Sequence, residues 1–573
     1  AELANLVGVL RTRGITMPYR IDFLVWVGAC ALMCATACSS EITRAESDFD
    51  VANGPSSGGG AGSSDGGSPS DELGDGNGFD LVACESAPLP VDQARRLNVT
   101  ELNTIVDDVL GDSSAPFSAI GNDYGIRIGT SLGTSERFLT DYLEVAEQIA
   151  GSYVERIDPE SACDQPDRAC AKATLAAVAA KLFRRPVSDA RLEGFASFAD
   201  VALDSGLSFD EGVAAGLTAI LMSPDFFTVG TNVESEPGVY VHDGHGMAEN
   251  LALALWNSVP DDALLAAVSD GSLDTPEGIE TQVRRMLEDT KGARFLRGFI
   301  DRHFDFPSAN AVPLGLEDVE GNREALAGDL RREAELLIEH VFANNLPVET
   351  LVNGTTTFIN ERLANYYGYD GVSGDEFVEF STAGTSRTSG LLTMGATLAQ
   401  EVDLIHRGVN VLQTYLCEAL VAPDPEVIEA ALDDIPDDAT VRDEVDYRIS
   451  NSACAACHVL IDPLGAAFER FDAGGFERST YDNGDSTDYS LEFQDTTIAG
   501  PSDVANAVLD DRFLPCMASQ VLGWVGARNI SLYEESGRCA SQRLVVDTGS
   551  GVGMRDLVVQ AFTSEVFRSR VVE

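Results

Sequence analysis

Apolar residues recur at intervals of three and four through the chain from about residue 97 onward, the spacing of one face of an α-helix. Residues 97–111 open with an N-cap candidate, continue with leucine, isoleucine and valine at helical positions, and close at Gly111. Similar periodicity, or richness in alanine and leucine, predicts further helices at 171–183, 211–221, 248–256, 276–289 and 324–343. We therefore expect a mainly α-helical body.

The segment 324–343 shows both faces of such a helix. Its apolar stripe consists of Leu326, Leu330, Ala334, Leu337 and Val341, and its charged face carries Arg331, Arg332, Glu333 and Glu335. Strand-like alternation is scarce, and 376–380 and 490–493 are the best candidates. The predicted fold class is mainly α, with several domains in the helical body.

The first 80 residues follow a different pattern. Met17 is the expected start of the protein, because a short apolar run at 23–33 follows it and has the length of a signal peptide core. Small residues then precede Cys38, which predicts a bacterial lipoprotein signal at 17–38 with Cys38 lipidated; an ordinary signal cut after Ala37 is the alternative. Residues 39–80 are rich in Gly, Ser and Asp and predict a disordered tether. We expect an exported envelope protein, periplasmic or on the outer membrane, bound to the membrane through its lipid.

The net charge of -55 narrows the choice of partners. Nucleic acid is excluded, because phosphate backbones require basic patches that a surface with 38 basic and 93 acidic residues can hardly assemble. The acidity is better explained by solubility, particularly in salty surroundings.

One short motif specifies a chemistry. Residues 454–458 read C-x-x-C-H, the c-type haem attachment pattern: Cys454 and Cys457 form thioethers to the porphyrin vinyl groups, and His458 binds the iron. A redox C-x-x-C would be expected near a βαβ pattern, and a structural zinc site would need a second ligand pair nearby; neither is present. A plain disulfide and a vestigial site are the remaining alternatives. We predict one covalent haem c per chain, and hence a C-terminal cytochrome-c-like region.

The other cysteines are expected to form disulfides, because export favours them. Six remain after the signal, anchor and haem cysteines are set aside, and six allow 15 pairings in principle. Short loops favour Cys163 with Cys170 and Cys516 with Cys539, which leaves Cys84 with Cys417.

A low-spin haem needs a sixth ligand, commonly Met or His. Met517, 59 residues after His458, is the preferred candidate, and Met394, His406 and Met554 are alternatives. Two weaker metal candidates are more simply explained as surface groups. They are the pair His242 and His245, and the acidic loop that contains Asp482, Asp485 and Asp488.

Several segments together resemble a family of large exported bacterial proteins of unknown function, the planctomycete-type cytochrome-associated proteins. The resemblance covers roughly residues 84–573 in the family's domain order. It is carried by the segments 95–97 with 101–103 and 110–111, 183–186 with 220–227, 255–261 with 360–364 and 367–368, 454–475, and Cys516 with 564–568. The chain departs from the family where Leu404-Ile405-His406 precedes Arg407-Gly408 in place of the usual Ser-Pro.

The composition of the first 80 residues and the family resemblance together divide the protein into seven predicted parts. They are the signal peptide 17–38, the tether 39–80, helical domains at 81–160, 161–230 and 240–380, the C-x-x-C-H domain 385–495, and a C-terminal helical domain 496–573. The preferred function is an electron carrier, or the electron-entry module of an envelope oxidoreductase with a redox partner protein. The alternatives are a disulfide-stabilised binding lipoprotein without haem and a catalytic oxidoreductase in which haem is a relay.

Overall fold

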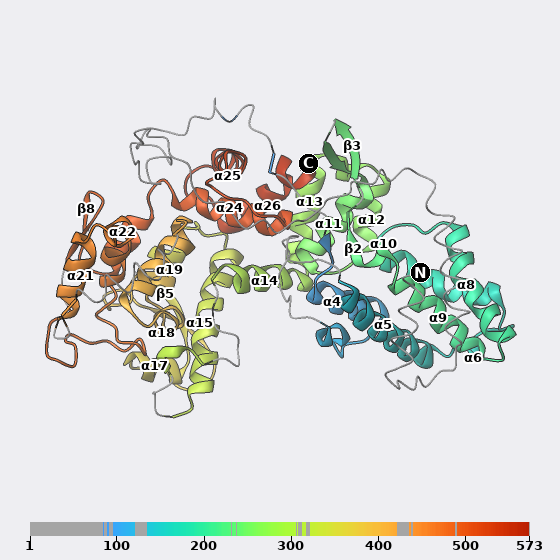
Figure 1. Cartoon of the computed structure of the whole chain (residues 1–573), viewed down its shortest axis with the longest axis horizontal. Helices are drawn as coiled ribbons and strands as arrows, with labels where there is room; N and C mark the ends of the chain where they lie inside the picture. Colours follow the sequence, from blue (N-terminus) through green and yellow to red (C-terminus); the bar gives the residue numbers. More distant parts are fainter. Residues whose placement is uncertain are drawn as a thin grey trace, which may run out of the picture. The chain divides into compact units, whose positions relative to one another are not determined.

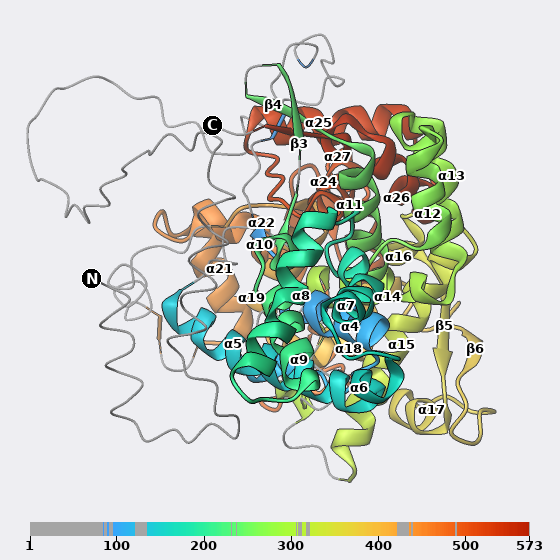
Figure 2. The ribbon, with the colours of Figure 1, turned by 90° about the vertical axis from the view of Figure 1, so that its right-hand side faces the viewer.

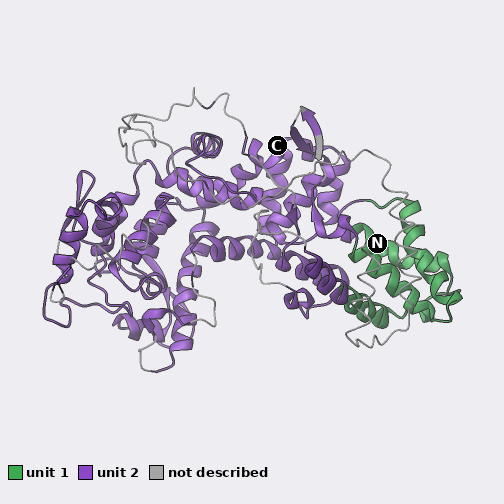
Figure 3. Cartoon of the chain, viewed as in Figure 1, with its two compact units in different colours: residues 1–66, 146–180, 186–222 green, residues 67–145, 181–185, 223–573 purple. Residues whose placement is uncertain are grey.

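The computed structural model describes Cys84 and residues 89–90, 95–120, 135–230, 232–236, 238–304, 306, 312–316, 321–420, 435–436, 439–487 and 490–571. These residues form two compact units (Figure 3). The first unit contains residues 146–180 and 186–222, and the second contains 67–145, 181–185 and 223–573, apart from the undescribed positions. The predicted signal peptide, Cys38 and the tether lie outside the described residues.

The smaller unit is built from helices alone. They are the second half of α5 (Glu136–Ile157), α6 (Pro159–Ala162), most of α7 (Arg168–Leu182), α8 (Asp189–Asp204) and α9 (Phe209–Leu221). Helices α8 and α9 pack closely because Gly212 has no side chain: a Cβ there would lie 2.5 Å from the Cα of Ala199. Ser208 and Glu211 form a capping box that fixes the start of α9.

The larger unit contains most of the remaining helices (Figure 1). Its longer ones are α4 (Val99–Leu110), α11 (Gly244–Trp256), α12 (Asp262–Ser269), α13 (Pro276–Glu288), α14 (Ala293–His303), α15 (Arg323–Ala343), α19 (Leu404–Leu416), α21 (Val441–Ser450), α22 (Ala455–Ala466), α23 (Pro501–Val508), α24 (Phe513–Gly526), α25 (Glu535–Thr548) and α26 (Met554–Thr563). Its shorter ones are η2 (Pro116–Ala119), α10 (Pro224–Phe227), η4 (Ser272–Asp274), η5 (Thr290–Gly292), η6 (Leu314–Leu316), α16 (Thr350–Asn353), α17 (Glu361–Tyr367), η7 (Gly390–Thr393), α18 (Gly395–Gln400) and α27 (Glu565–Arg568).

A large hydrophobic core runs through this unit. Helix α11 contacts α13 and α24, helix α26 contacts the same two helices, and all four lie together in both views (Figures 1 and 2). Apolar side chains from Met247 to Phe567 belong to the same buried cluster, which includes Trp256, Phe299, Met517 and Phe562. Burial of this large apolar surface is the main term that stabilises the fold.

The strands are short, and every pair is antiparallel. Strand β1 (Arg95–Arg96) pairs with β2 (Thr228–Val229), β5 (Thr356–Ile359) with β6 (Val378–Ser381), and β7 (Leu491–Phe493) with β8 (Thr496–Ile498). The remaining sheet has the order β3 (Asn232–Glu236), β4 (Val239–His242) and β9 (Ser569–Val571). The expectation of a mainly helical, multidomain body with few strands is confirmed, and β6 and β7 overlap the two strand candidates at 376–380 and 490–493.

Caps and stripes account for the predicted helices. Asn98 caps α4 through a capping box with Glu101, and Gly111 ends it with φ 70°. The apolar stripe of α15 is buried as expected, but Glu333 does not lie on a charged face. Only 2% of this residue is exposed, because it sits three residues after Leu330 and four before Leu337, at the edge of the stripe.

Arg184 shows why one of the family-like segments has its composition. This buried residue adopts φ 57° and donates hydrogen bonds to the carbonyls of Leu182, Phe226 and Thr228 at 2.9 Å each. Its Nε lies 2.7 Å from Glu249 Oε1 on α11. The arginine is therefore a structural clamp that satisfies backbone carbonyls.

All six expected cysteines form disulfides, but two of the three pairings differ from the prediction. Cys163 pairs with Cys170 as expected, whereas Cys84 pairs with Cys539 and Cys417 with Cys516. The predicted pairs Cys516–Cys539 and Cys84–Cys417 are wrong. Cys516 is on α24 and faces the end of α19, where Cys417 is the C-cap, while Cys539 on α25 faces the segment that carries Cys84. Helix direction, and not loop length, decided the pairing.

No described helix is both long enough and apolar enough to cross a membrane.

Candidate functional site

The C-x-x-C-H motif lies at the start of α22, and this helix crosses α19 very closely. A Cβ on Gly408 of α19 would collide with the carbonyl oxygen of Ile461, and one on Gly465 of α22 would collide with that of Leu404. Two glycines, one on each helix, are therefore required for this contact. The two helices lie with α21 at the left of Figure 1.

Arg407 on α19 also binds the segment that follows α22. Its buried guanidinium donates to the carbonyls of Phe468 at 2.9 Å, Phe471 at 2.8 Å and Asp472 at 2.6 Å, just beyond the end of α22. The Arg407-Gly408 dipeptide is thus structural: the arginine satisfies backbone carbonyls and the glycine permits the close contact.

The motif itself forms the first turn of α22. Cys454 is the N-cap residue, and the N–H groups of Cys457 and His458 bond to its carbonyl at 3.2 and 3.1 Å. Both thiols are unpaired and partly exposed. Two residues separate the cysteines, so the structure presents both thiols and the histidine from about one helical turn.

A buried carboxylate lies one turn below the histidine. Asp462 has no exposed side-chain surface, and its Oδ1 is 2.7 Å from His458 Nδ1. Its second oxygen accepts a hydrogen bond of 2.9 Å from Arg448 Nε on α21. The side chains of His458, Asp462 and Arg448 thus form a hydrogen-bonded triad that joins α22 to α21.

This triad of side chains indicates which ring nitrogen of His458 is available to bind a ligand. An ionised carboxylate only accepts hydrogen bonds, so in a neutral imidazole at this position Nδ1 carries the proton and Nε2 keeps its lone pair. Among the described residues, no hydrogen-bond partner reaches Nε2, and 19% of the side chain is exposed. The neighbouring Val459 is an exposed apolar side chain. Two thiols, an imidazole with a free Nε2 and an apolar neighbour fit the attachment of a haem c.

The sixth-ligand candidates occupy different surroundings. Met517 on α24, Met394 before α18 and Met554 on α26 are all at most 4% exposed and belong to the main core. His406 on α19 is two-thirds exposed, and its Nδ1 is 2.7 Å from Asp403 Oδ2. The assignment of Met517 as the sixth ligand stays a prediction.

The weaker metal candidates are not gathered into a site. His242 on β4 contacts Asn250, and His245 lies in the first turn of α11. Asp482 is exposed and Asp485 is half-buried in the same loop, and Asp488 lies outside the described residues. Nowhere in the described part of the chain do three or more His, Cys, Asp or Glu side chains form a group able to hold a metal ion.

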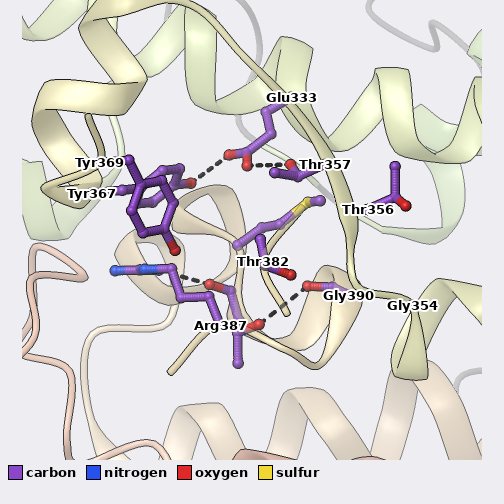
Figure 4. A pocket seen from close by; sticks show the side chains of 11 residues that line it. Glu333, Gly354, Thr356, Thr357, Tyr367, Tyr369, Thr382, Arg387 and Gly390 are labelled. Atoms are coloured by element: carbon purple, nitrogen blue, oxygen red, sulfur yellow. Dashed lines mark hydrogen bonds between the residues drawn. The ribbon is translucent and has the colours of Figure 1, made fainter. Parts of the chain in front are cut away.

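A second polar cluster surrounds Glu333 (Figure 4). Thr357 on β5 donates a hydrogen bond of 2.6 Å to Glu333 Oε1, and the Tyr367 hydroxyl donates to Oε2. Tyr367 in turn accepts a hydrogen bond of 3.0 Å from the backbone N–H of Gly395. Burial is the largest influence on this carboxyl and raises the pKa of Glu333 to about 7, although the two hydroxyls and Arg387 act in the opposite direction.

Arg387 closes this cluster. Its guanidinium carbon lies 4.4 Å from the centre of the Tyr367 ring and 4.6 Å from that of Phe471. It donates to the Thr393 carbonyl at 2.7 Å and also to the Gly475 carbonyl. The cavity that these residues line measures about 10 Å³, the space of one water molecule, so it has no room for an organic substrate.

The sequence patterns do not mark Asp462, Arg448 or Glu333 as site residues. A signal for Asp462 was available, because it follows His458 by four residues and the two share one helical face. Arg448 could not be found in the same way, since its position relative to Asp462 depends on the packing of α21 against α22. A small core of Leu404, Val445, Ala466 and Leu491 holds these elements together.

Comparison with known families gives three matches. Residues 170–227 match PSD5, a protein of unknown function (DUF1595). Residues 243–369 match PSD4, a protein of unknown function (DUF1592), and contain the Glu333 cluster's helix α15. Residues 384–481 match PSCyt3, a protein of unknown function (DUF1588), and contain α19, α21 and the C-x-x-C-H helix α22.

Neither the curated proteins nor the solved structures compared with the chain gave a match. The three matches occur in the order that the sequence resemblance implies, and all three are domains associated with planctomycete cytochrome c proteins. The chain therefore belongs to the planctomycete cytochrome-associated multidomain family, whose function is unknown.

Proposed function

We propose that the protein carries one covalent haem c on the first turn of α22 and transfers electrons in the bacterial envelope. The observation that carries the proposal is the arrangement of His458: its Nδ1 is held by a buried carboxylate, while its Nε2 faces away without a partner among the described residues. The match of residues 384–481 to PSCyt3 supports the same assignment.

Each residue of the motif has a distinct task in this proposal. Each thiol, Cys454 and Cys457, adds across one vinyl group: the S–H bond breaks, an S–C bond forms, and the proton goes to the other vinyl carbon. The addition needs no oxidant and has no leaving group. His458 Nε2 would bind the iron, and a bound haem would supply one-electron transfer. Met517 is the proposed second iron ligand.

The cellular setting is part of the proposal. Lipidation of Cys38 after export would hold the folded body at a membrane by the tether of residues 39–80, near a redox partner protein. The three disulfides of the folded body support an oxidising compartment outside the cytoplasm. Whether the protein is an electron carrier or the electron-entry module of an oxidoreductase depends on that partner.

The test is production of the full chain in a bacterial host with cytochrome c maturation, followed by haem staining and a pyridine haemochrome spectrum. We expect one covalent haem per chain, and none after Cys454→Ser with Cys457→Ser. The matched control is Cys163→Ser with Cys170→Ser, which removes another local cysteine pair and is expected to retain the haem. Absence of covalent haem from the unmutated protein would overturn the proposal.

Mass spectrometry of the unreduced protein identifies what replaces haem in that case. A peptide with residues 454–458 that is lighter by two hydrogens would show a disulfide, and with it a binding lipoprotein without haem. A peptide heavier by one haem supports the proposal.

A further inference from the structure

The hydrogen-bonded triad of His458, Asp462 and Arg448 would act directly on the proposed haem iron through its histidine ligand. We propose that Asp462, held in place by Arg448, is the positioning residue of the iron ligand His458 and that it stabilises the oxidised state of the iron. This inference rests on the proposed haem site. It concerns the regulation of that site and the kind of redox partner it fits.

Geometry makes Asp462 specific for this task. The carboxylate is on the same face of α22 as His458, and both of its oxygens are used, one by the imidazole at 2.7 Å and one by Arg448 Nε at 2.9 Å. A ring held by one nitrogen has little freedom to turn, so Nε2 keeps one direction. Outer partners of this kind commonly fix the orientation of metal-bound histidines and raise their basicity.

Burial makes the contact strong. Asp462 has no exposed side-chain surface, so water does not compete for its oxygens, and charge-assisted hydrogen bonds are shorter and stronger than neutral ones. The carboxylate draws the Nδ1 proton toward itself and leaves more electron density on the ring. A more electron-rich imidazole favours ferric over ferrous iron.

Arg448 has a separate role. Its guanidinium is 11% exposed and neutralises a carboxylate that would otherwise be isolated in the interior. Because Arg448 is on α21, the orientation of His458 depends on the packing of α21 against α22. The site therefore fits a partner that accepts electrons from a haem of low potential.

The experiment compares variants of the matured full-length holoprotein. Asp462→Asn removes the carboxylate, but it leaves Arg448 without its anion. The double variant Asp462→Asn with Arg448→Gln removes both charges, keeps groups of similar shape and leaves the net charge near the iron unchanged. The matched control is Arg442→Gln with Asp446→Asn, which removes an exposed ion pair from the same helix α21.

The readouts are the midpoint potential and the electron paramagnetic resonance spectrum of the ferric haem. In the double variant we expect the ferric-to-ferrous ratio at a fixed potential to fall by about tenfold or more, an upward shift of about 59 mV. We also expect the ferric g values to shift, because they report the donor strength of the axial imidazole. The control pair is expected to change neither quantity.

The outcomes separate the two proposals. If the unmutated protein holds no covalent haem, the proposed function and this inference fail together. If haem is present and the double variant matches the unmutated protein in potential and g values, only the inference fails. If the neutral variants fold but lose the haem, Asp462 is needed to present His458, which supports its positioning role. Should neither neutral variant fold, Asp462→Glu keeps the charge and moves the oxygens by one methylene, and an upward shift in potential is again expected.

Discussion

Asp462 and Glu333 are both carboxylates enclosed by the larger unit, yet they are stabilised in opposite ways. Asp462 is fully buried and has two hydrogen-bonding partners, the cationic guanidinium of Arg448 and the imidazole of His458. Glu333 is 2% exposed, and its hydrogen-bond donors among the described residues are the hydroxyls of Thr357 and Tyr367. Arg387 lies near Glu333 but directs its N–H groups to backbone carbonyls.

The difference teaches what each carboxylate can do. A buried carboxylate with a cation beside it provides a fixed negative charge, which is useful for orienting a histidine. A buried carboxyl with neutral donors alone takes up a proton near neutral pH, as the pKa of about 7 for Glu333 shows. We therefore assign the chemistry to the Asp462 site and a structural role to the Glu333 site.

The largest effect is expected when Asp462 loses its cationic partner, the guanidinium of Arg448. Arg448→Met leaves a buried charge without its partner, and we expect a loss of about 3 kcal/mol in the free energy of unfolding. Urea unfolding of the protein with its disulfides intact measures this loss.

The control for this prediction is Arg442→Met, six residues earlier on α21. Its ion pair with Asp446 is exposed, so the expected loss is below about 0.5 kcal/mol. Equal losses in the two variants would contradict the view that Asp462 depends on a buried ion pair.

Replacing Glu333 by a neutral residue tests whether this second buried carboxyl takes up a proton near neutral pH. Its pKa is raised from 4.5 to about 7 in the folded protein, so the protonated form is favoured by folding. That stabilisation is complete below about pH 4.5 and is lost as the pH rises through 7. Glu333→Gln remains neutral, so at pH 8 we expect it to be more stable than the unmutated protein by up to about 3 kcal/mol, and nearly equal to it at pH 5.

Urea unfolding at pH 5 and pH 8 checks this prediction. Glu339→Gln on the same helix removes an exposed carboxylate that pairs with Arg332, and its effect is expected to be small and the same at both pH values. A difference between Glu333→Gln and the unmutated protein that stays constant from pH 5 to 8 would show that Glu333 is charged throughout.

The contact between α19 and α22 sharpens the comparison, because the Asp462 site depends on it and the Glu333 site does not. In Gly408→Ala the new methyl group collides with the Ile461 carbonyl oxygen, and we expect a loss of about 1–3 kcal/mol in unfolding free energy. Thermal and urea unfolding measure the effect.

Gly328 on α15 offers a matched control. No atom lies within 4 Å of a Cβ built on it, so Gly328→Ala is expected to stabilise the helix by about 0.5–1 kcal/mol. A neutral Gly408→Ala variant would mean that the two helices can separate without cost.

The smallest effect is expected at the exposed counterpart of the His458–Asp462 pair. Asp403 and His406 form the same kind of contact on α19, but half or more of each side chain is exposed. Asp403→Asn retains an oxygen that can cap the helix, so unfolding free energy should change by less than about 0.5 kcal/mol. A loss as large as that of Arg448→Met would show that burial does not distinguish the two sites.

Local signals in the sequence predicted much of the structure. The periodicity of 97–111 and 324–343, the cap at Asn98 and the C-x-x-C-H spacing each involve residues within one or two turns of one another. The same locality explains why the Cys163–Cys170 disulfide was predicted correctly. The family resemblance was confirmed over three of its domains.

Contacts between distant segments were predicted poorly. The pairings Cys84–Cys539 and Cys417–Cys516 span 455 and 99 residues and depend on which way α24 and α25 face. Glu333 was assigned to the charged face of its helix, because nothing nearby in the sequence indicates its burial. Its partners Thr357 and Tyr367 lie 24 and 34 residues later. Pattern within a helix cannot show what packs against its edge.

The sequence by itself determined the candidate chemistry, because attachment of a haem c needs two cysteines for the thioethers and an adjacent histidine for the iron, all within about one helical turn. Only the tertiary structure decided how that chemistry is supported. Arg448 reaches Asp462 from another helix, and Gly408 and Gly465 allow α19 to approach α22 closely. The physical reason is that spacing fixes which residues share a turn, whereas burial and charge pairing arise only when separate helices pack together.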